Sequence, residues 1–256
     1  MLYLLQKVVA AIFILTAAVY SQPDNERQGI ILNNQGVTQF QNGEAQEALK
    51  SFNRSAEIFP TNAIVHRNLG YLYRELNDFN GAEAAFRNAI RLAPDHAVTY
   101  NQLGIVLMEL KRDKEALDTF QKADALKPGD ATILMNMGNA QLKLKDYREA
   151  TATLERARSI DPKSAPIRVS LGYAYAMRKK IDLAIAEVRH AIQLDPKDEE
   201  AQFFLGNLYL ANRDKDAAIA QQRTVSALNP ELARRLYQAI FSDKILVVGP
   251  SALSPK

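Results

Sequence analysis

The stretch that decides the fold is Ala63–His96, which reads AIVHRNLGYLYRELNDFNGAEAAFRNAIRLAPDH. Its fixed points are Gly70, Ala82 and Pro94, and the same residue types return when the sequence is shifted by 34 residues in either direction. The three series are Gly36, Gly70, Gly104, Gly138, Gly172 and Gly206; Ala48, Ala82, Ala116, Ala150, Ala184 and Ala218; and Pro60, Pro94, Pro128, Pro162, Pro196 and Pro230. Self-similarity at a fixed period of this length indicates one structural unit that is repeated and stacked.

Each unit predicts two amphipathic helices joined by a tight polar turn. The turns are expected at Gln41–Gly43, Asn77–Asp78, Lys111–Asp113, Lys145–Asp146, Lys179–Lys180 and Arg213–Asp214. The proline of each unit follows its second helix, because the ring forbids further helix. The glycine lies inside the first helix, where it costs about 0.5–1 kcal/mol relative to alanine. Six glycines at that cost predict a close approach of two helices.

The pattern of a small residue, glycine and an aromatic, then alanine, phenylalanine and proline, resembles the tetratricopeptide repeat. The resemblance covers residues 29–232 as six repeats, 29–62, 63–96, 97–130, 131–164, 165–198 and 199–232. It implies an all-α fold, a right-handed α-solenoid of helix hairpins with a C-terminal capping helix. The family's Phe position reads Phe52, Phe86, Phe120, Leu154, Val188 and Gln222. The family's Trp position reads Leu32, His66, Tyr100, Leu134, Arg168 and Gln202, so the packing there must differ.

The two ends of the chain differ from the repeats. Residues 1–21 carry one charge, Lys7, and a mostly apolar run of 13 residues at 8–20, shorter than the ~20 of a membrane helix. They predict a signal peptide cleaved before Gln22, with an uncleaved N-terminal anchor as the alternative. Residues 22–28 predict a linker. Residues 233–256 predict a capping helix and tail, whose run at 245–248 docks on the last repeat or offers a strand to a partner.

Composition excludes several classes of function. The chain has 47% hydrophobic and 24% charged residues and a net charge of +3. It therefore lacks the strong positive electrostatic potential that would attract nucleic acid. There is no cysteine, which removes disulfides, thiolate catalysis and cysteine-ligated metals. The three histidines occupy different repeat positions, and no glycine-rich phosphate loop is present. We therefore expect a non-enzymatic protein with no metal and no cofactor.

In the resembled family, the first helices of the repeats line a concave face that binds partners. One position of this lining reads Asn34, Asn68, Gln102 and Asn136. Such amides both donate and accept, so a row of them can pair with the backbone of an extended peptide; alternatively they satisfy groups at helix contacts. The predicted partner-binding residues are Asn34, Arg67, Asn68, Tyr71, Asn101, Gln102, Met108, Met135, Asn136, Asn139 and Tyr173. The methionines and tyrosines supply an adaptable apolar lining, or ordinary core.

These observations predict a protein–protein interaction scaffold that holds a peptide segment of another protein on its concave face. The alternative is an envelope assembly or structural factor that is anchored by residues 1–21 and acts by oligomerisation. Either way the repeats are expected outside the cytoplasm, periplasmic or secreted, and the membrane is contacted only through residues 1–21. The partner, the pathway and the oligomeric state are left open by the sequence.

Overall fold

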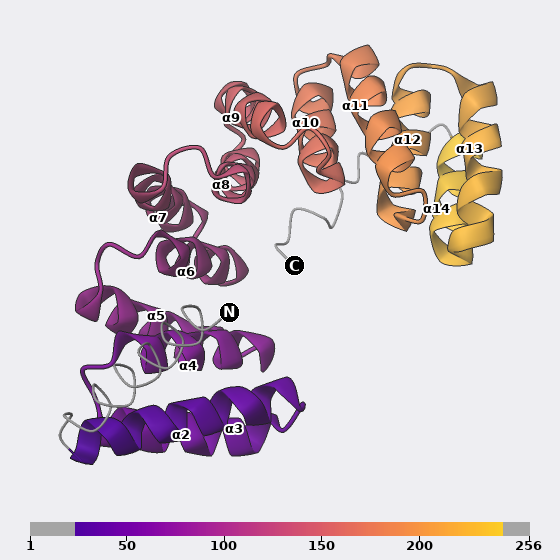
Figure 1. Cartoon of the computed structure of the whole chain (residues 1–256). Helices are drawn as coiled ribbons and strands as arrows, with labels where there is room; N and C mark the ends of the chain where they lie inside the picture. The colour runs from indigo at the N-terminus through magenta and orange to yellow at the C-terminus, as the bar shows by residue number, and fades with distance from the viewer. Residues whose placement is uncertain (1–23, 243–256) are drawn as a thin grey trace, which may run out of the picture. The chain divides into compact units, whose positions relative to one another are not determined.

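The computed structural model describes residues 24–242, which form thirteen helices and no strand. The all-α solenoid predicted from the sequence is confirmed. The helices in order are α2 (Asp24–Gln41), α3 (Ala45–Ile58), α4 (Ala63–Glu75), α5 (Phe79–Leu92), α6 (Ala97–Glu109), α7 (Asp113–Leu126), α8 (Ala131–Lys143), α9 (Tyr147–Ile160), α10 (Ala165–Met177), α11 (Ile181–Leu194), α12 (Glu199–Ala211), α13 (Lys215–Leu228) and α14 (Pro230–Phe241) (Figure 1). None of these described helices is long and apolar enough to cross a lipid bilayer.

Helices α2 to α13 form pairs, and each pair turns at a residue with left-handed backbone geometry. That residue recurs every 34 positions: Gly43, Asn77, Lys111, Lys145, Lys179 and Arg213, with φ between 59° and 81°. Such geometry costs an ordinary L-residue roughly 1–2 kcal/mol, and only the first turn uses glycine to avoid it. The turns fall where the sequence predicts them.

Four of the repeated glycines, Gly36, Gly70, Gly138 and Gly172, lie against the side chain at the family's Phe position. A Cβ added to Gly70 would lie 2.6 Å from two ring carbons of Phe86, and one added to Gly36 would lie 2.7 Å from the ring of Phe52. Leu154 fills the same space at Gly138. The close approach predicted from the glycines is confirmed, and the group that enters the space is the large side chain of the second helix. The six repeated alanines are completely buried beside it, at 0% exposure.

In three of the six repeats, the family's Trp position carries a polar side chain that bonds to the preceding turn. The Nε2 atom of His66 lies 2.9 Å from the carbonyl oxygen of Pro60, to which it donates. Arg168 donates to Pro162 O at 2.8 Å, and Gln202 donates to Pro196 O at 3.0 Å. Each bond thus ties the first helix of a repeat to the turn before it. This recurring contact replaces the packing that a tryptophan would supply.

At the start of the described chain the structure differs from the prediction, and at its end the predicted capping helix is present. Residues 24–28, which the sequence analysis placed in a linker, form the start of α2. Helix α14 packs as the capping helix, with Leu232, Leu236 and Ile240 buried. Leu236 also explains why Gln222 is tolerated at the Phe position, because the Leu236 Cδ2 occupies the space over Gly206 that an added Cβ would fill. The predicted signal peptide, residues 1–21, and the predicted tail beyond 242 lie outside the described residues.

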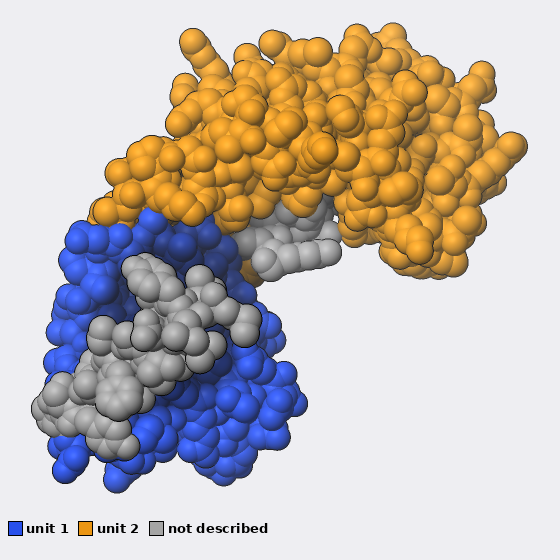
Figure 2. Space-filling view, in the orientation of Figure 1, with its two compact units in different colours: residues 1–106 blue, residues 107–256 orange. Residues whose placement is uncertain are grey.

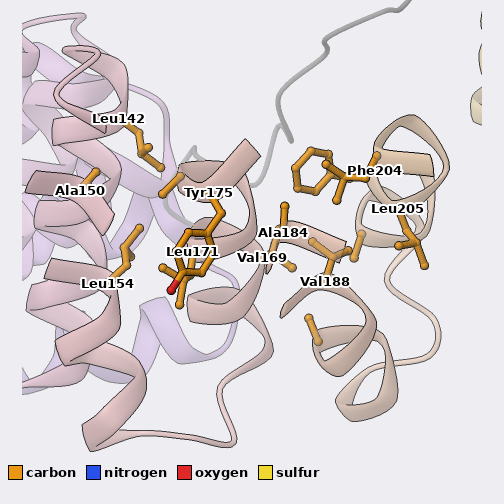
Figure 3. Close-up of a cluster of buried hydrophobic side chains, with 14 residues drawn as sticks. Leu142, Ala150, Leu154, Val169, Leu171, Tyr175, Ala184, Val188, Phe204 and Leu205 are labelled. Atoms are coloured by element: carbon orange, nitrogen blue, oxygen red, sulfur yellow. The ribbon is translucent and has the colours of Figure 1, made fainter. Parts of the chain in front are cut away.

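The chain divides into two compact units, residues 1–106 (unit 1) and residues 107–256 (unit 2), which Figure 2 colours separately. In unit 1 the core is built on Phe52, Val65 and Leu72. In unit 2 a cluster of mostly aliphatic side chains runs from α8 to α12 and includes Leu154 and Val188 (Figure 3). A second cluster joins α12 and α13 to the capping helix.

Candidate functional site

The first helix of each pair carries the predicted partner-binding residues, and we call their positions the A-helix surface. Position nine of each 34-residue repeat belongs to it and is occupied in turn by Val37, Tyr71, Ile105, Asn139, Tyr173 and Asn207. The two units are described in turn, because the predicted residues divide between them. Unit 1 holds Asn34, Arg67, Asn68, Tyr71, Asn101 and Gln102; unit 2 holds Met108, Met135, Asn136, Asn139 and Tyr173.

Unit 1 contains a pocket of about 330 Å³ between α2, α3 and α4. The structure brings two predicted residues, Asn68 and Tyr71, together in its wall. The remaining wall residues are Val37, Phe40, Gln41, Phe52, Arg74 and Glu75. Apolar side chains from three helices therefore form the lining, and one cation and one carboxylate stand beside them. A pocket of this size is at the lower end of the range of about 300–1,000 Å³ for ligand sites.

Tyr71 is held in the pocket wall by its neighbours. Its ring meets Phe86 edge-on, with centroids 5.5 Å apart and planes at 86°. Burial raises the pKa of the Tyr71 hydroxyl, an effect opposed by the charges of Arg67 and Arg74. The phenol is therefore neutral at physiological pH and presents one O–H donor and two acceptor lone pairs.

The amides of unit 1 take part in contacts between first helices. Asn68 Nδ2 donates to Asn33 Oδ1 at 2.8 Å, and Asn33 Nδ2 donates to Asn34 Oδ1 at 3.4 Å. Gln102 accepts a hydrogen bond from Arg74. Asn33 is 7% exposed and was not among the predicted residues, although it occupies the same repeat position as Arg67 and Asn101. The amide row is thus partly used in helix packing, while Asn68 Oδ1 accepts no hydrogen bond from the described residues.

Arg67 forms a polar contact with His96 at the edge of the A-helix surface. Arg67 Nη1 lies 3.2 Å from His96 Nε2, and His96 Nδ1 lies 2.8 Å from Thr99 Oγ1. Burial, with the Arg67 charge, lowers the pKa of His96. The imidazole is therefore neutral at pH 7, and its Nε2 accepts from the guanidinium. The pair fixes the direction of Arg67 without supplying a catalytic base.

The predicted residues of unit 2 are more deeply buried than those of unit 1. Met108 is 1% exposed, and Asn136 and Asn139 are each 3% exposed. Met135 packs, half-buried, against the cluster of α8 to α12. Tyr173 lies against Phe204, with ring centroids 6.1 Å apart, and burial raises the pKa of its hydroxyl. These residues form a neutral surface.

Among residues 24–242, no group of three or more histidine, aspartate or glutamate side chains is placed to hold a metal ion. The most buried ionic group joins Arg168 to Glu187 at 2.7 Å, with Arg158 on the second carboxylate oxygen. It links α9, α10 and α11, with the Arg168 and Glu187 side chains largely buried and Arg158 partly exposed.

Comparison with known families and structures places the chain among repeat proteins. Models described as tetratricopeptide repeat match residues 67–131 and 182–232, 107–171, 27–95, and 165–198, which together cover 27–232. No curated protein matches by sequence.

Among solved structures, the type IV pilus biogenesis factor PilW is 20% identical, covers 82% of this chain and 98% of its own, and gives a TM-score of 0.75. PilF of Pseudomonas aeruginosa is 19% identical, with 85% and 99% covered and a TM-score of 0.71. YrrB, described as a repeat protein with an unusual peptide-binding site, is 23% identical, with 73% and 97% covered and a TM-score of 0.58. At these sequence identities the structural similarity shows a shared fold and nothing more. The matched residues and the shared fold together establish that the chain belongs to the tetratricopeptide-repeat family.

Proposed function

We propose that this protein is a non-enzymatic scaffold that binds an extended segment of another protein on its A-helix surface, with an apolar side chain of that segment in the pocket of unit 1. The family supports the general role of protein–protein interaction. The single observation that carries the finer proposal is the pocket itself, because two residues selected from the sequence, Asn68 and Tyr71, line it.

The chemistry of the pocket suits one large side chain and its flanking backbone. Val37, Phe40 and Phe52 offer apolar contact, which contributes about 25 cal/mol for each Å² of apolar surface removed from water. Asn68 Oδ1 is available to accept a backbone N–H of an extended peptide. The ion pair between Arg74 and Glu75, at 2.8 Å, gives the wall both signs of charge. The best ligand is therefore an aromatic or long aliphatic residue with polar neighbours.

The test is selection of short random peptides displayed on phage against the full-length protein, followed by affinity measurement for the enriched sequences. Tyr71→Ala removes one wall of the pocket, and Val37→Trp fills it. Each variant should weaken binding by about tenfold to a hundredfold, as expected for loss of a central anchor. Tyr237→Ala is the matched control, because Tyr237 is an exposed tyrosine on α14. Enriched peptides that bind both pocket variants as tightly as the control would reject the proposal.

A second candidate is an assembly factor of the cell envelope that is held by residues 1–21. It is favoured by the apolar run at 8–20 and by the likeness to PilF and PilW, whose chains it covers almost completely. N-terminal sequencing of the mature protein, together with cell fractionation, distinguishes the two forms. A mature protein that begins at Gln22 supports the free exported scaffold, whereas an intact N-terminus in the membrane fraction supports the anchored factor.

A further inference from the structure

The two ends of the unit 1 pocket differ in charge. Helix α4 supplies one wall from Asn68 to Glu75, which spans about 10 Å along the helix axis. At the far end of this wall, Arg74 and Glu75 neutralise each other through their contact at 2.8 Å. Arg67 lies just before the near end, next to Asn68 on the same helix. The pocket is therefore neutral at one end and positive at the other.

Arg67 has no carboxylate partner among the described residues. At repeat positions five, six, nine and twelve, which form the A-helix surface, unit 1 has two charged residues, Arg67 and Arg74. Arg74 has its counter-charge in Glu75, whereas Arg67, which is half-buried, contacts the neutral imidazole of His96. A cation that is partly removed from water gains most from an anion placed beside it. This part of the surface thus lacks one negative charge, which a partner can supply.

Arg67 is held in a fixed direction by a chain of hydrogen bonds that begins on α6. Thr99, which is 2% exposed, accepts at Oγ1 from His96 Nδ1 at 2.8 Å, and His96 Nε2 accepts from Arg67 Nη1 at 3.2 Å. This chain uses one nitrogen of the guanidinium, and the edge formed by Nε and Nη2 donates to none of the described residues. That edge carries two parallel N–H groups, which is the geometry that binds a carboxylate through two hydrogen bonds.

We propose that the segment bound in the unit 1 pocket carries an aspartate or glutamate two residues from its apolar anchor, and that this carboxylate pairs with Arg67. The inference rests on the proposed function, because it assigns the chemistry that flanks the anchor in the same pocket. In this arrangement His96 is a positioning residue, since it orients Arg67 without touching the ligand.

The spacing of two residues follows from the geometry of α4. The pocket wall runs along this helix, so an extended segment that lies in the pocket follows the helix axis. Arg67 comes one helical turn before Tyr71, about 6 Å along the axis. Side chains at i and i+2 of an extended segment point to the same side and are roughly 6.6 Å apart. An anchor beside Tyr71 therefore places one such neighbour beside Arg67 and the other beside Glu75, so only one flank should prefer an acid.

The test begins with a phage library of short peptides that have a fixed central phenylalanine and random flanks, selected against the full-length protein. The wild type should enrich aspartate or glutamate two residues from the phenylalanine, on one flank. Arg67→Glu should enrich lysine or arginine at that same place, because the charge it meets is reversed. A library that yields no binder rejects the proposed function and this inference together. Binders that depend on Tyr71 but show no acidic preference reject this inference alone.

Affinity measurements on an enriched peptide, synthesised with an amidated carboxyl terminus, then isolate the pairing. Replacing its acid by the corresponding amide should weaken binding to the wild type about tenfold and leave binding to Arg67→Gln unchanged. Arg91→Gln is the matched control, because Arg91 is an exposed arginine on α5 and its loss removes the same charge. Tyr71→Ala should weaken the acidic peptide and the amide peptide alike. A loss that is as large in Arg67→Gln as in the wild type overturns the proposal.

The positioning of Arg67 is tested by two variants of His96. His96→Leu removes the acceptor for Arg67 Nη1, so it should weaken the acidic peptide about threefold to tenfold and leave the amide peptide unchanged. His96→Gln restores an acceptor and should recover most of the affinity, while circular dichroism verifies that the helices remain in both variants. Equal weakening of the two peptides by His96→Leu would show that His96 supports the fold alone, and would reject its role in directing Arg67.

Discussion

Unit 1 and unit 2 use the same 34-residue pattern, yet their A-helix surfaces differ in charge and in burial. In unit 1 the surface has an open pocket, with Arg74 and Glu75 in its wall. In unit 2 the position of Arg74 is taken by the neutral residues Met108, Leu142, Ala176 and Leu210, and Asn136 and Asn139 are buried. The repeat therefore fixes where a binding surface lies, whereas the residues at a few positions decide what each part of it accepts.

The two units also differ in how they pack beneath that surface. In unit 1 the space above the repeated glycines is filled by the rings of Phe52 and Phe86. In unit 2 it is filled by aliphatic side chains, and at Gly206 by Leu236 of the capping helix. A planar ring in a closed core can move aside less easily than the terminal methyl groups of a leucine when an extra atom is introduced. The same glycine substitution should therefore destabilise the two units to different degrees.

The largest expected effect on stability is at the family's Trp position, where a polar residue can be replaced in each of the two units. Arg168→Ala removes a buried guanidinium that bonds to Pro162 and Glu187, and should lower the free energy of unfolding by about 3 kcal/mol. His66→Ala removes one hydrogen bond to a turn in unit 1, worth about 1 kcal/mol or less. Urea unfolding followed by circular dichroism measures both. If the two variants lost equal free energy of unfolding, the ion pair between Arg168 and Glu187 would not contribute to the stability of unit 2.

The next largest effect on stability is expected when the repeated glycine of each unit is replaced by alanine. Gly70→Ala places a Cβ 2.6 Å from the ring of Phe86, which is completely buried, and should destabilise the protein by about 1–3 kcal/mol despite the better helix propensity of alanine. Gly206→Ala meets the Cδ2 end of Leu236, which can rotate, and should cost less than about 1 kcal/mol. Melting temperatures of the two variants test the order. A larger loss in Gly206→Ala would show that the capping helix is the more rigid contact.

These comparisons also show how far the sequence leads. The period of Gly70, Ala82 and Pro94 predicts the helix pairs, the turns and the close contacts, because each depends on backbone geometry or side-chain volume at one repeated position. The partner of each glycine was not predictable in detail, since Leu236 comes from outside the repeats. At Gly206 that contact depends on how α14 docks, which no single position encodes.

The candidate site was predicted less completely for the same reason. Asn68 and Tyr71 were selected by their repeat position and do line the pocket. Asn33 was missed, because its bond to Asn68 joins two neighbouring repeats and neither residue alone signals it. The burial of Met108 was also beyond the sequence, since Met suits a surface lining and a core equally well.

The smallest expected effect concerns the turns, where the two units can be compared at one backbone geometry. Asn77 in unit 1 and Lys145 in unit 2 have φ values of 59° and 66°. Glycine enters this region without strain, but it also adds freedom to the unfolded chain, so Lys145→Gly should stabilise the protein by about 0.5–1 kcal/mol. Asn77→Gly should change it by a few tenths of a kcal/mol at most, because asparagine tolerates left-handed geometry.

Thermal unfolding of both glycine variants, with Lys145→Ala as the control that keeps a Cβ, decides the matter. The alanine variant should be no more stable than the wild type, since its backbone meets the same steric cost as lysine. If Lys145→Ala and Lys145→Gly gave the same gain, the effect would come from removing a lysine side chain and not from the turn. The backbone at Lys145 would then be no more strained than the backbone at Asn77, and the turns of the two units would not differ in strain.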